Sequence, residues 1–183
     1  DWLDFEFNSR TNEPFQRDRE WQALSFLPSD LSIHSEWKKF WPQTGTPPCW
    51  DAVGLVQVGS TSDILLVEAK AHMDELSSSC GATSKDSLSK INDAFKEAKK
   101  FFNAPPSANW MKKYYQYANR LAALFFLNKN NISTRLLYIY FTGENSKLFG
   151  NKSNKCPKSE SEWQKPLQDM YSHLGLKDPI QRV

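Results

Sequence analysis

The chain has 183 residues, a formal net charge of +2 and an aromatic content of 14%, which is enough for one domain with a substantial core. So small a net charge does not by itself indicate a nucleic-acid partner, and no apolar run reaches the length of a membrane span. The cysteines lie far apart without CxxC spacing, which indicates reduced thiols: Cys49, Cys80 and Cys156. Because the first residues show no signal-peptide pattern, we expect a soluble cytoplasmic protein with no membrane partner.

The first forty residues predict two helices. Residues 2–8 alternate weakly between apolar and acidic side chains, which fits either a short edge strand or an ordered arm. From residue 17 to 27 the apolar residues recur at helical spacing, which predicts a first helix that carries Glu20. A second helix is predicted between Ser29 and Pro42, with an apolar stripe rich in tryptophan.

Two apolar runs then predict a β-hairpin, because the turn-rich residues 59–63 between them are too few for a crossover. The second run is apolar on both faces and yet ends in Glu68 and Lys70. Pairing Val58 with Asp63 across the turn would place Asp51 opposite Lys70. Since residues directly opposite share a face, Asp51, Glu68 and Lys70 would meet at one end of the hairpin.

The second half of the chain predicts three helices and a strand. A small polar loop at residues 77–84 precedes a helix that ends near Phe102. The lysines of this helix either contact phosphates or form a solvated face: Lys90, Lys96, Lys99 and Lys100. A strand is predicted over residues 133–143. Because two helices connect it to the Glu68 strand, the connection is a crossover and the two strands would run parallel. A basic loop at residues 147–158 and a terminal helix at residues 161–173 complete the chain.

The helix predicted over residues 111–127 carries a polar stripe. Gln116, Asn119 and Arg120 share one side, because side chains three and four apart are neighbours on a helix. The rest of the helix is apolar, so an arginine there needs an anionic partner. Arg120 therefore either lines an active cleft or is a structural group tied to a buried carboxylate.

Two carboxylates beside an ammonium group suit a hard divalent cation. Mg²⁺ binds through one or two carboxylates and completes its octahedron with water and substrate phosphate. A nearby lysine can orient the attacking water or neutralise charge on the phosphorane, so phosphodiester hydrolysis is the natural reaction. A zinc site built from Cys49, His72 and Cys80 is a second interpretation, although no ligand pair has finger-like spacing.

The order Asp51, a hairpin and then Glu68-Ala69-Lys70 resembles the core of the PD-(D/E)-x-K nuclease superfamily, which has the restriction-endonuclease-like fold. The resemblance implies one α/β domain over residues 1–183, with a central mixed β-sheet flanked by α-helices. Trp50 stands where the name-giving pattern has proline. The usual core also has a strand ahead of the aspartate-bearing one, which only residues 2–8 could supply.

Carried over, the resemblance implies a role for each motif residue. Asp51, Glu68 and the carbonyl of Ala69 would bind Mg²⁺, with Mn²⁺ as an alternative, and Lys70 would assist the nucleophilic water. Glu20 would add a third acidic group, unless it is an ordinary solvated charge. Substrate contacts are expected from the polar stripe: Gln116, Asn119 and Arg120.

We therefore expect a metal-dependent endonuclease or exonuclease, a hydrolase whose nucleic-acid partner is DNA, with a homodimer left open. A binding module that keeps the same fold and recognises nucleic acid or protein without cleavage is the alternative. A third interpretation treats Glu68 and Lys70 as an ordinary buried ion pair in an unrelated α/β protein, in which case Asp51 would point away from both.

Overall fold

The computed structural model of the chain describes residues 1–3, 20–143 and 156–177. Its larger sheet has three strands in the order β3-β4-β5: β3 (Ala52–Val58), β4 (Thr61–Lys70) and β5 (Thr134–Tyr140). β3 pairs antiparallel with β4, and β5 pairs parallel with β4. The sheet is therefore mixed, and both the hairpin and the parallel crossover predicted from the sequence are confirmed.

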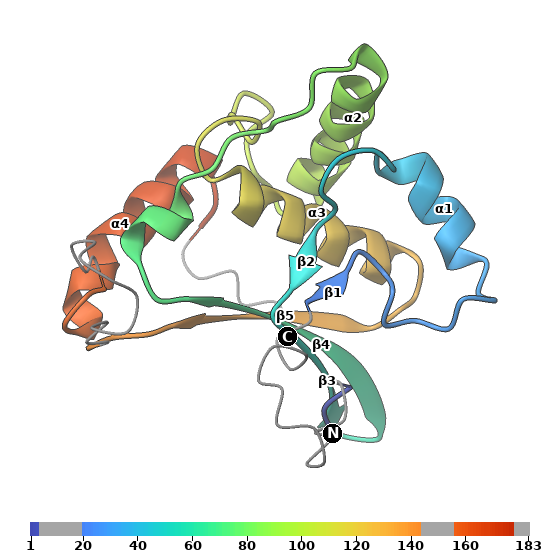
Figure 1. The fold of residues 1–183 in the computed structure, drawn as a ribbon, viewed down its shortest axis with the longest axis horizontal. Helices are drawn as coiled ribbons and strands as arrows, with labels where there is room; N and C mark the ends of the chain where they lie inside the picture. The colour runs from blue at the N-terminus through green and yellow to red at the C-terminus, as the bar shows by residue number, and fades with distance from the viewer. Residues whose placement is uncertain (4–19, 144–155, 178–183) are drawn as a thin grey trace, which may run out of the picture.

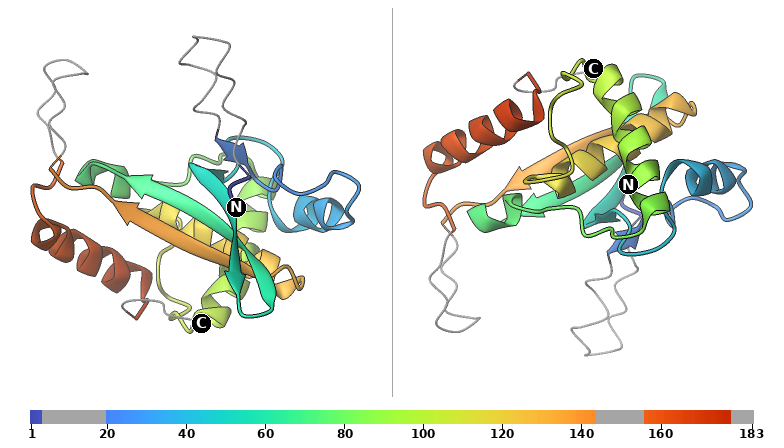
Figure 2. Two further views of the ribbon diagram at one scale, coloured as in Figure 1. Left: turned by 90° about the horizontal axis from the view of Figure 1, so that it is seen from below. Right: turned by 90° about the horizontal axis from the view of Figure 1, so that it is seen from above.

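The helices cover one face of this sheet, as the three views in Figures 1 and 2 show. They are α1 (Ile33–Phe40), the 3-10 helix η2 (Met73–Leu76), α2 (Lys85–Phe101), α3 (Tyr115–Lys129) and α4 (Glu160–Leu174). α3 lies against the sheet and is apolar on almost all sides, with most of its residues buried. The described residues thus form an α/β structure in which helices pack on a mixed sheet.

Strand alternation separates a buried face of the sheet from an exposed one. Val53 and Leu66 are directly paired and fully buried on the helix side. On the opposite face of β5, Leu137 is 42% exposed, and Phe141 just beyond the strand is 51% exposed. Glu68 and Lys70 follow Leu66 at alternate positions, so the strand directs both charged side chains toward the helices.

The hairpin register differs by two residues from the one predicted. Val58 pairs with Thr61, not with Asp63, so only Gly59 and Ser60 form the turn. Asp63 instead accepts hydrogen bonds from Ser133 at 2.7 Å and from Arg135 Nε at 2.7 Å, and these two partners lower the pKa of its carboxyl. An even shift keeps each residue on its own face, which is why the predicted convergence survives.

The first predicted helix is wrong over its described part. Trp21–Gln22 form strand β1, which pairs antiparallel with β2 (Cys49–Trp50) in a separate two-stranded sheet. Turns follow β1, and Ala23 has a positive φ of 49° that a helix does not allow. The spacing of the apolar residues there reflects successive turns that bury Leu24.

The other helices are confirmed with shifted ends. α3 begins at Tyr115 and not at Met111, because Lys113 and Tyr114 have positive φ values of 48° and 60°. α1 begins at Ile33, after Ser32. In the described ranges, no helix combines the length and apolar character needed to cross a bilayer.

Residues 1–3 lie along the free edge of β3. Trp2 forms an isolated antiparallel bridge with Gly54, and Leu3 N donates to Val53 O at 2.8 Å. An added Cβ at position 54 would lie 3.0 Å from the Trp2 ring, so the ring would have to shift slightly to admit a side chain there. The rest of the predicted arm and residues 147–155 of the predicted basic loop lie outside the described residues.

Candidate functional site

A cavity of about 570 Å³ opens where β4 ends beside β2 and the start of α3. Every residue that the nuclease resemblance singled out lines this cavity: Glu20, Asp51, Glu68, Ala69, Lys70, Gln116, Asn119 and Arg120. Of the three residues considered for a zinc site, Cys49 lines it, whereas His72 and Cys80 do not. They come from the segment before β1, from the β2–β3 junction, from β4 and from α3. The structure therefore brings the predicted site residues together.

Asp51 lies at a bend between β2 and β3, directly beside the end of β4. Its backbone N–H still donates to Val67 O at 3.0 Å, while its Oδ2 accepts the N–H of Ala69 at 2.5 Å. The carbonyl of Lys70 accepts from Phe141 N on the β5 side. Since successive carbonyls of a strand point to opposite sides, the Ala69 carbonyl faces the Asp51 side.

Glu68 is the charged centre of the cavity, with a side chain that is 1% exposed. Its Oε1 accepts from Lys70 Nζ at 2.6 Å, and its Oε2 accepts from Arg120 Nε at 2.9 Å. Both cations are also buried. A buried carboxylate is tolerated only with such charged partners, so the two cations fix Glu68 in one orientation.

Arg120 connects the sheet to the polar stripe of α3. Its Nη1 donates to Asn119 Oδ1 at 2.8 Å, and its guanidinium carbon lies 5.3 Å from the centre of the Trp50 ring. Trp50 is fully buried, and its Nε1 donates to Ala23 O at 2.9 Å. Arg120 is thus both cavity-lining and tied to a buried carboxylate, which joins the two interpretations offered for it.

The loop after η2 holds the start of α3 in place. Ser78 O accepts from Tyr115 N at 3.1 Å, and Ser78 Oγ accepts from Gln116 N at 2.8 Å. These bonds satisfy two of the N–H groups that a helix start leaves unpaired. The polar stripe is consequently positioned by a loop that the sequence predicted to lie near the site.

Two further groups in the cavity are held in their neutral forms. Burial, and then the negative charge of Glu20, raise the pKa of the Cys49 thiol. Burial, followed by the neighbouring Cys80, raises the pKa of Tyr115 well above its usual range. Both groups therefore keep their protons at neutral pH and can act as hydrogen-bond donors.

Glu75 is a cavity residue that sequence reasoning missed. Its Oε1 accepts from Ala71 N at 3.1 Å and from His72 N at 2.7 Å, which closes the chain turn after β4. Cys49, Ser78 and Tyr115 line the cavity as well. The one available signal was the small polar loop at residues 77–84; the approach of Glu75 depends on a turn that no motif specifies.

The donor set suits a hard divalent cation. Four carboxylates and two cationic side chains line the cavity, so its formal charge is negative. Asp51, Glu68 and the Ala69 carbonyl offer the oxygen ligands that Mg²⁺ prefers. Within the described ranges no group of three or more His, Cys, Asp or Glu side chains is placed to hold a metal ion. A Mg²⁺ site completed by water and phosphate requires only one or two carboxylates.

Comparisons of the chain with protein-family models, with curated proteins and with solved structures returned no match. The class that the fold defines is an α/β protein with a mixed sheet flanked by helices.

Proposed function

We propose that this chain is a Mg²⁺-dependent nuclease of restriction-endonuclease-like fold that hydrolyses phosphodiester bonds in DNA. The observation that carries the proposal is the convergence of Asp51, Glu68 and Lys70, with the stripe from α3, on one negatively charged cavity. The hairpin pattern of the sequence predicts the same convergence, and carboxylates beside an ammonium group are the groups that this reaction would use.

Each residue of the cavity would have its own role in the proposed reaction. Asp51, Glu68 and the carbonyl of Ala69 would hold the cation, which would supply positive charge near the phosphoryl group and a water of lowered pKa. Lys70 would orient the attacking water and neutralise charge that develops on the phosphate. This role fits its position, because its ammonium is already fixed at 2.6 Å from Glu68 and lines the cavity.

The stripe on α3 would position the substrate. Arg120 uses Nε and one Nη1 hydrogen for Glu68 and Asn119, so the guanidinium retains further donors for a phosphate. Gln116 lies one turn earlier on the same side of the helix and lines the same cavity. Glu20 would add a further carboxylate at the cavity mouth.

A binding module that does not cleave is the second candidate. Both oxygens of Glu68 are already paired with cations, which is how a purely structural carboxylate would be held. On that interpretation the cavity would still recognise a polar partner, but substitution of Lys70 would change stability and not a reaction rate.

The test is cleavage of end-labelled single-stranded and double-stranded DNA, with RNA in parallel, in Mg²⁺, in Mn²⁺ and in EDTA. We expect metal-dependent cleavage that falls about 100-fold or more in Lys70→Ala, because a charge-stabilising donor of this kind contributes that much. Asp51→Asn and Glu68→Gln should lose Mn²⁺ binding measured by calorimetry, while circular dichroism shows a folded protein.

Lys129→Ala is the matched control, since Lys129 ends α3 outside the cavity, in an exposed pair with Glu97. It should cleave as the wild type does. A folded wild-type protein that cleaves none of these substrates, and binds Mn²⁺ no better than Asp51→Asn, would refute the nuclease. Nucleic-acid binding without cleavage would instead favour the binding module.

A further inference from the structure

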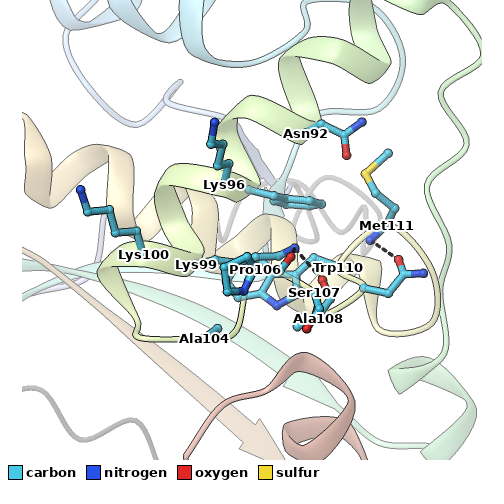
Figure 3. A pocket seen from close by; sticks show the side chains of 12 residues that line it. Asn92, Lys96, Lys99, Lys100, Ala104, Pro106, Ser107, Ala108, Trp110 and Met111 are labelled. Atoms are coloured by element: carbon cyan, nitrogen blue, oxygen red, sulfur yellow. Dashed lines mark hydrogen bonds between the residues drawn. The ribbon is translucent and has the colours of Figure 1, made fainter.

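A second cavity, of about 770 Å³, lies between the second half of α2 and the loop that leads toward α3. Figure 3 shows it lined by α2 side chains on one side and by residues 104–111 on the other. Its volume falls within the roughly 300–1,000 Å³ of typical small-molecule sites. It is separate from the cavity of Glu68. Phe95 of this cavity packs against Tyr115 of the other, with ring centres 5.8 Å apart, so the two rings lie between the cavities.

The charge of this cavity is entirely positive. Lys96, Lys99 and Lys100 line it, and no carboxylate does. Some lysines elsewhere on the helices have acidic partners: Lys39 pairs with Glu36, and Lys129 pairs with Glu97. For Lys96 and Lys100, by contrast, no ion pair occurs among the residues that the structure describes.

Lys99 is fixed while its two neighbours are not. Its Nζ donates to Ala108 O at 2.5 Å and to Pro106 O at 3.2 Å, and lies 5.9 Å from the centre of the Trp110 ring. Burial lowers its pKa, a cost that a bound anion would offset. Figure 3 shows Lys96 and Lys100 extending from α2 away from Trp110 and the loop, so their flexible stems must turn back for the ammonium groups to reach a ligand in the cavity.

The remaining walls combine apolar side chains with three polar ones, which are Asn92, Ser107 and Asn109. Phe95 and Trp110 are almost fully buried, so they shape the floor and do not offer an open stacking surface. Trp110 Nε1 donates to Leu174 O at 2.9 Å, which anchors the loop to α4. Met111 and Ala108 add partly exposed apolar surface. Such walls favour a ligand with an organic portion over a bare ion.

The helix dipole gives only part of an explanation for these lysines. Lys99 and Lys100 lie in the last turn of α2, where cations interact favourably with the dipole. That effect accounts neither for Lys96, one turn earlier, nor for a preformed cavity with no acidic residue.

We propose that this cavity is a second binding site, for an organic phosphate whose phosphate group contacts Lys96, Lys99 and Lys100 and whose carrier rests on the Met111 side. The carrier could be a nucleoside or a sugar, since both present the same phosphate. The site does not depend on the nuclease proposal.

Calorimetric titration tests it with thymidine 5′-monophosphate, glucose 6-phosphate, inorganic phosphate and unphosphorylated thymidine. We expect one of the two organic phosphates to bind, inorganic phosphate to bind more weakly, and thymidine not to bind. Preference between the two organic phosphates identifies the carrier. The double variant Lys96→Ala/Lys100→Ala should bind about tenfold more weakly or worse, because two charged contacts are lost.

The matched control is Lys85→Ala/Lys90→Ala, which removes the same charge from the same helix outside the cavity. It should keep wild-type affinity. Equal losses in the two double variants would mean non-specific attraction, and absence of binding by both organic phosphates would overturn the proposal. Lys70→Ala should leave this binding unchanged, so failure of the nuclease and failure of the phosphate site give different results.

Discussion

At the scale of single residues, Glu68 determines the arrangement around it. Its carboxylate lies between the Lys70 ammonium, which comes from its own strand, and the Arg120 guanidinium, which comes from α3. A carboxylate buried to this degree is strongly unfavourable without partners. The ion pairs thus connect the sheet to the helix layer and also place the charges of the candidate site.

Removing Arg120 tests this connection. We expect Arg120→Met to lower the free energy of unfolding by about 2–3 kcal/mol, because Glu68 loses one charged hydrogen bond and keeps only Lys70. Urea denaturation measures the loss. In the control Lys129→Ala, which breaks a half-exposed pair, the loss should stay below about 1 kcal/mol. Equal losses would mean that the Glu68 pair adds no more stability than an exposed one.

Much of the candidate site could be predicted from sequence, for a reason that concerns charge burial. Glu68 and Lys70 end an apolar strand, and Arg120 lies within an apolar helix, so each needed an opposite charge in the interior. Glu75 and Cys49 gave no such signal. Their places depend on how the chain turns after β4 and on how β2 pairs with β1, which are tertiary outcomes.

At the scale of elements, the hairpin shows that a register error of two residues does not change which side chains share a face. The predicted register placed Asp51 opposite Lys70, whereas the observed pairing of Ala52 with Val67 brings Asp51 level with Glu68. Side chains alternate with period two, so this shift left every residue on its face. The turn is shorter than predicted because Gly59, with φ of 60°, permits a two-residue connection.

Gly59→Ala tests the dependence on this turn. An added Cβ meets nothing within 4 Å there, so the expected loss of about 1 kcal/mol comes from the left-handed backbone alone. Gly81→Ala is the control, since Gly81 also has open space and does not have a positive φ. The melting temperature, measured by thermal denaturation, should fall for Gly59→Ala and not for Gly81→Ala. If both variants melt as the wild type does, the turn is not strained by a side chain.

The wrong first helix has a long-range cause. Residues 21–27 have helical spacing of apolar groups, but the indole N–H of Trp50 donates to Ala23 O, and Ala23 N donates to Pro48 O at 2.7 Å. Pairing with β2 satisfies backbone groups that a helix would have satisfied internally. Because β2 is distant in sequence, no local pattern could reveal this competition.

At the scale of the whole molecule, the described structure has two layers, the sheet and the helices on one of its faces. The helix side of the sheet contains the core and the buried charges. The other side presents exposed apolar groups, chiefly Leu137, Phe141 and the ring of Trp2. The sequence predicted the sheet and its helices, but not this asymmetry, because an apolar strand reads the same whether one or both faces are covered.

Leucine-to-alanine changes on the two faces test this two-layer arrangement. Leu66→Ala should lower the free energy of unfolding by about 2–5 kcal/mol, since Leu66 is fully buried beneath the helices. Leu137→Ala should lower it by less than about 1 kcal/mol, because that side chain is 42% exposed and leaves no cavity. Urea denaturation measures the free energy of unfolding of each variant, and sedimentation at the same protein concentrations measures its oligomeric state. A large loss for Leu137→Ala that grows with protein concentration would mean that a second copy covers this face in solution, and the two-layer molecule would then be half of a dimer.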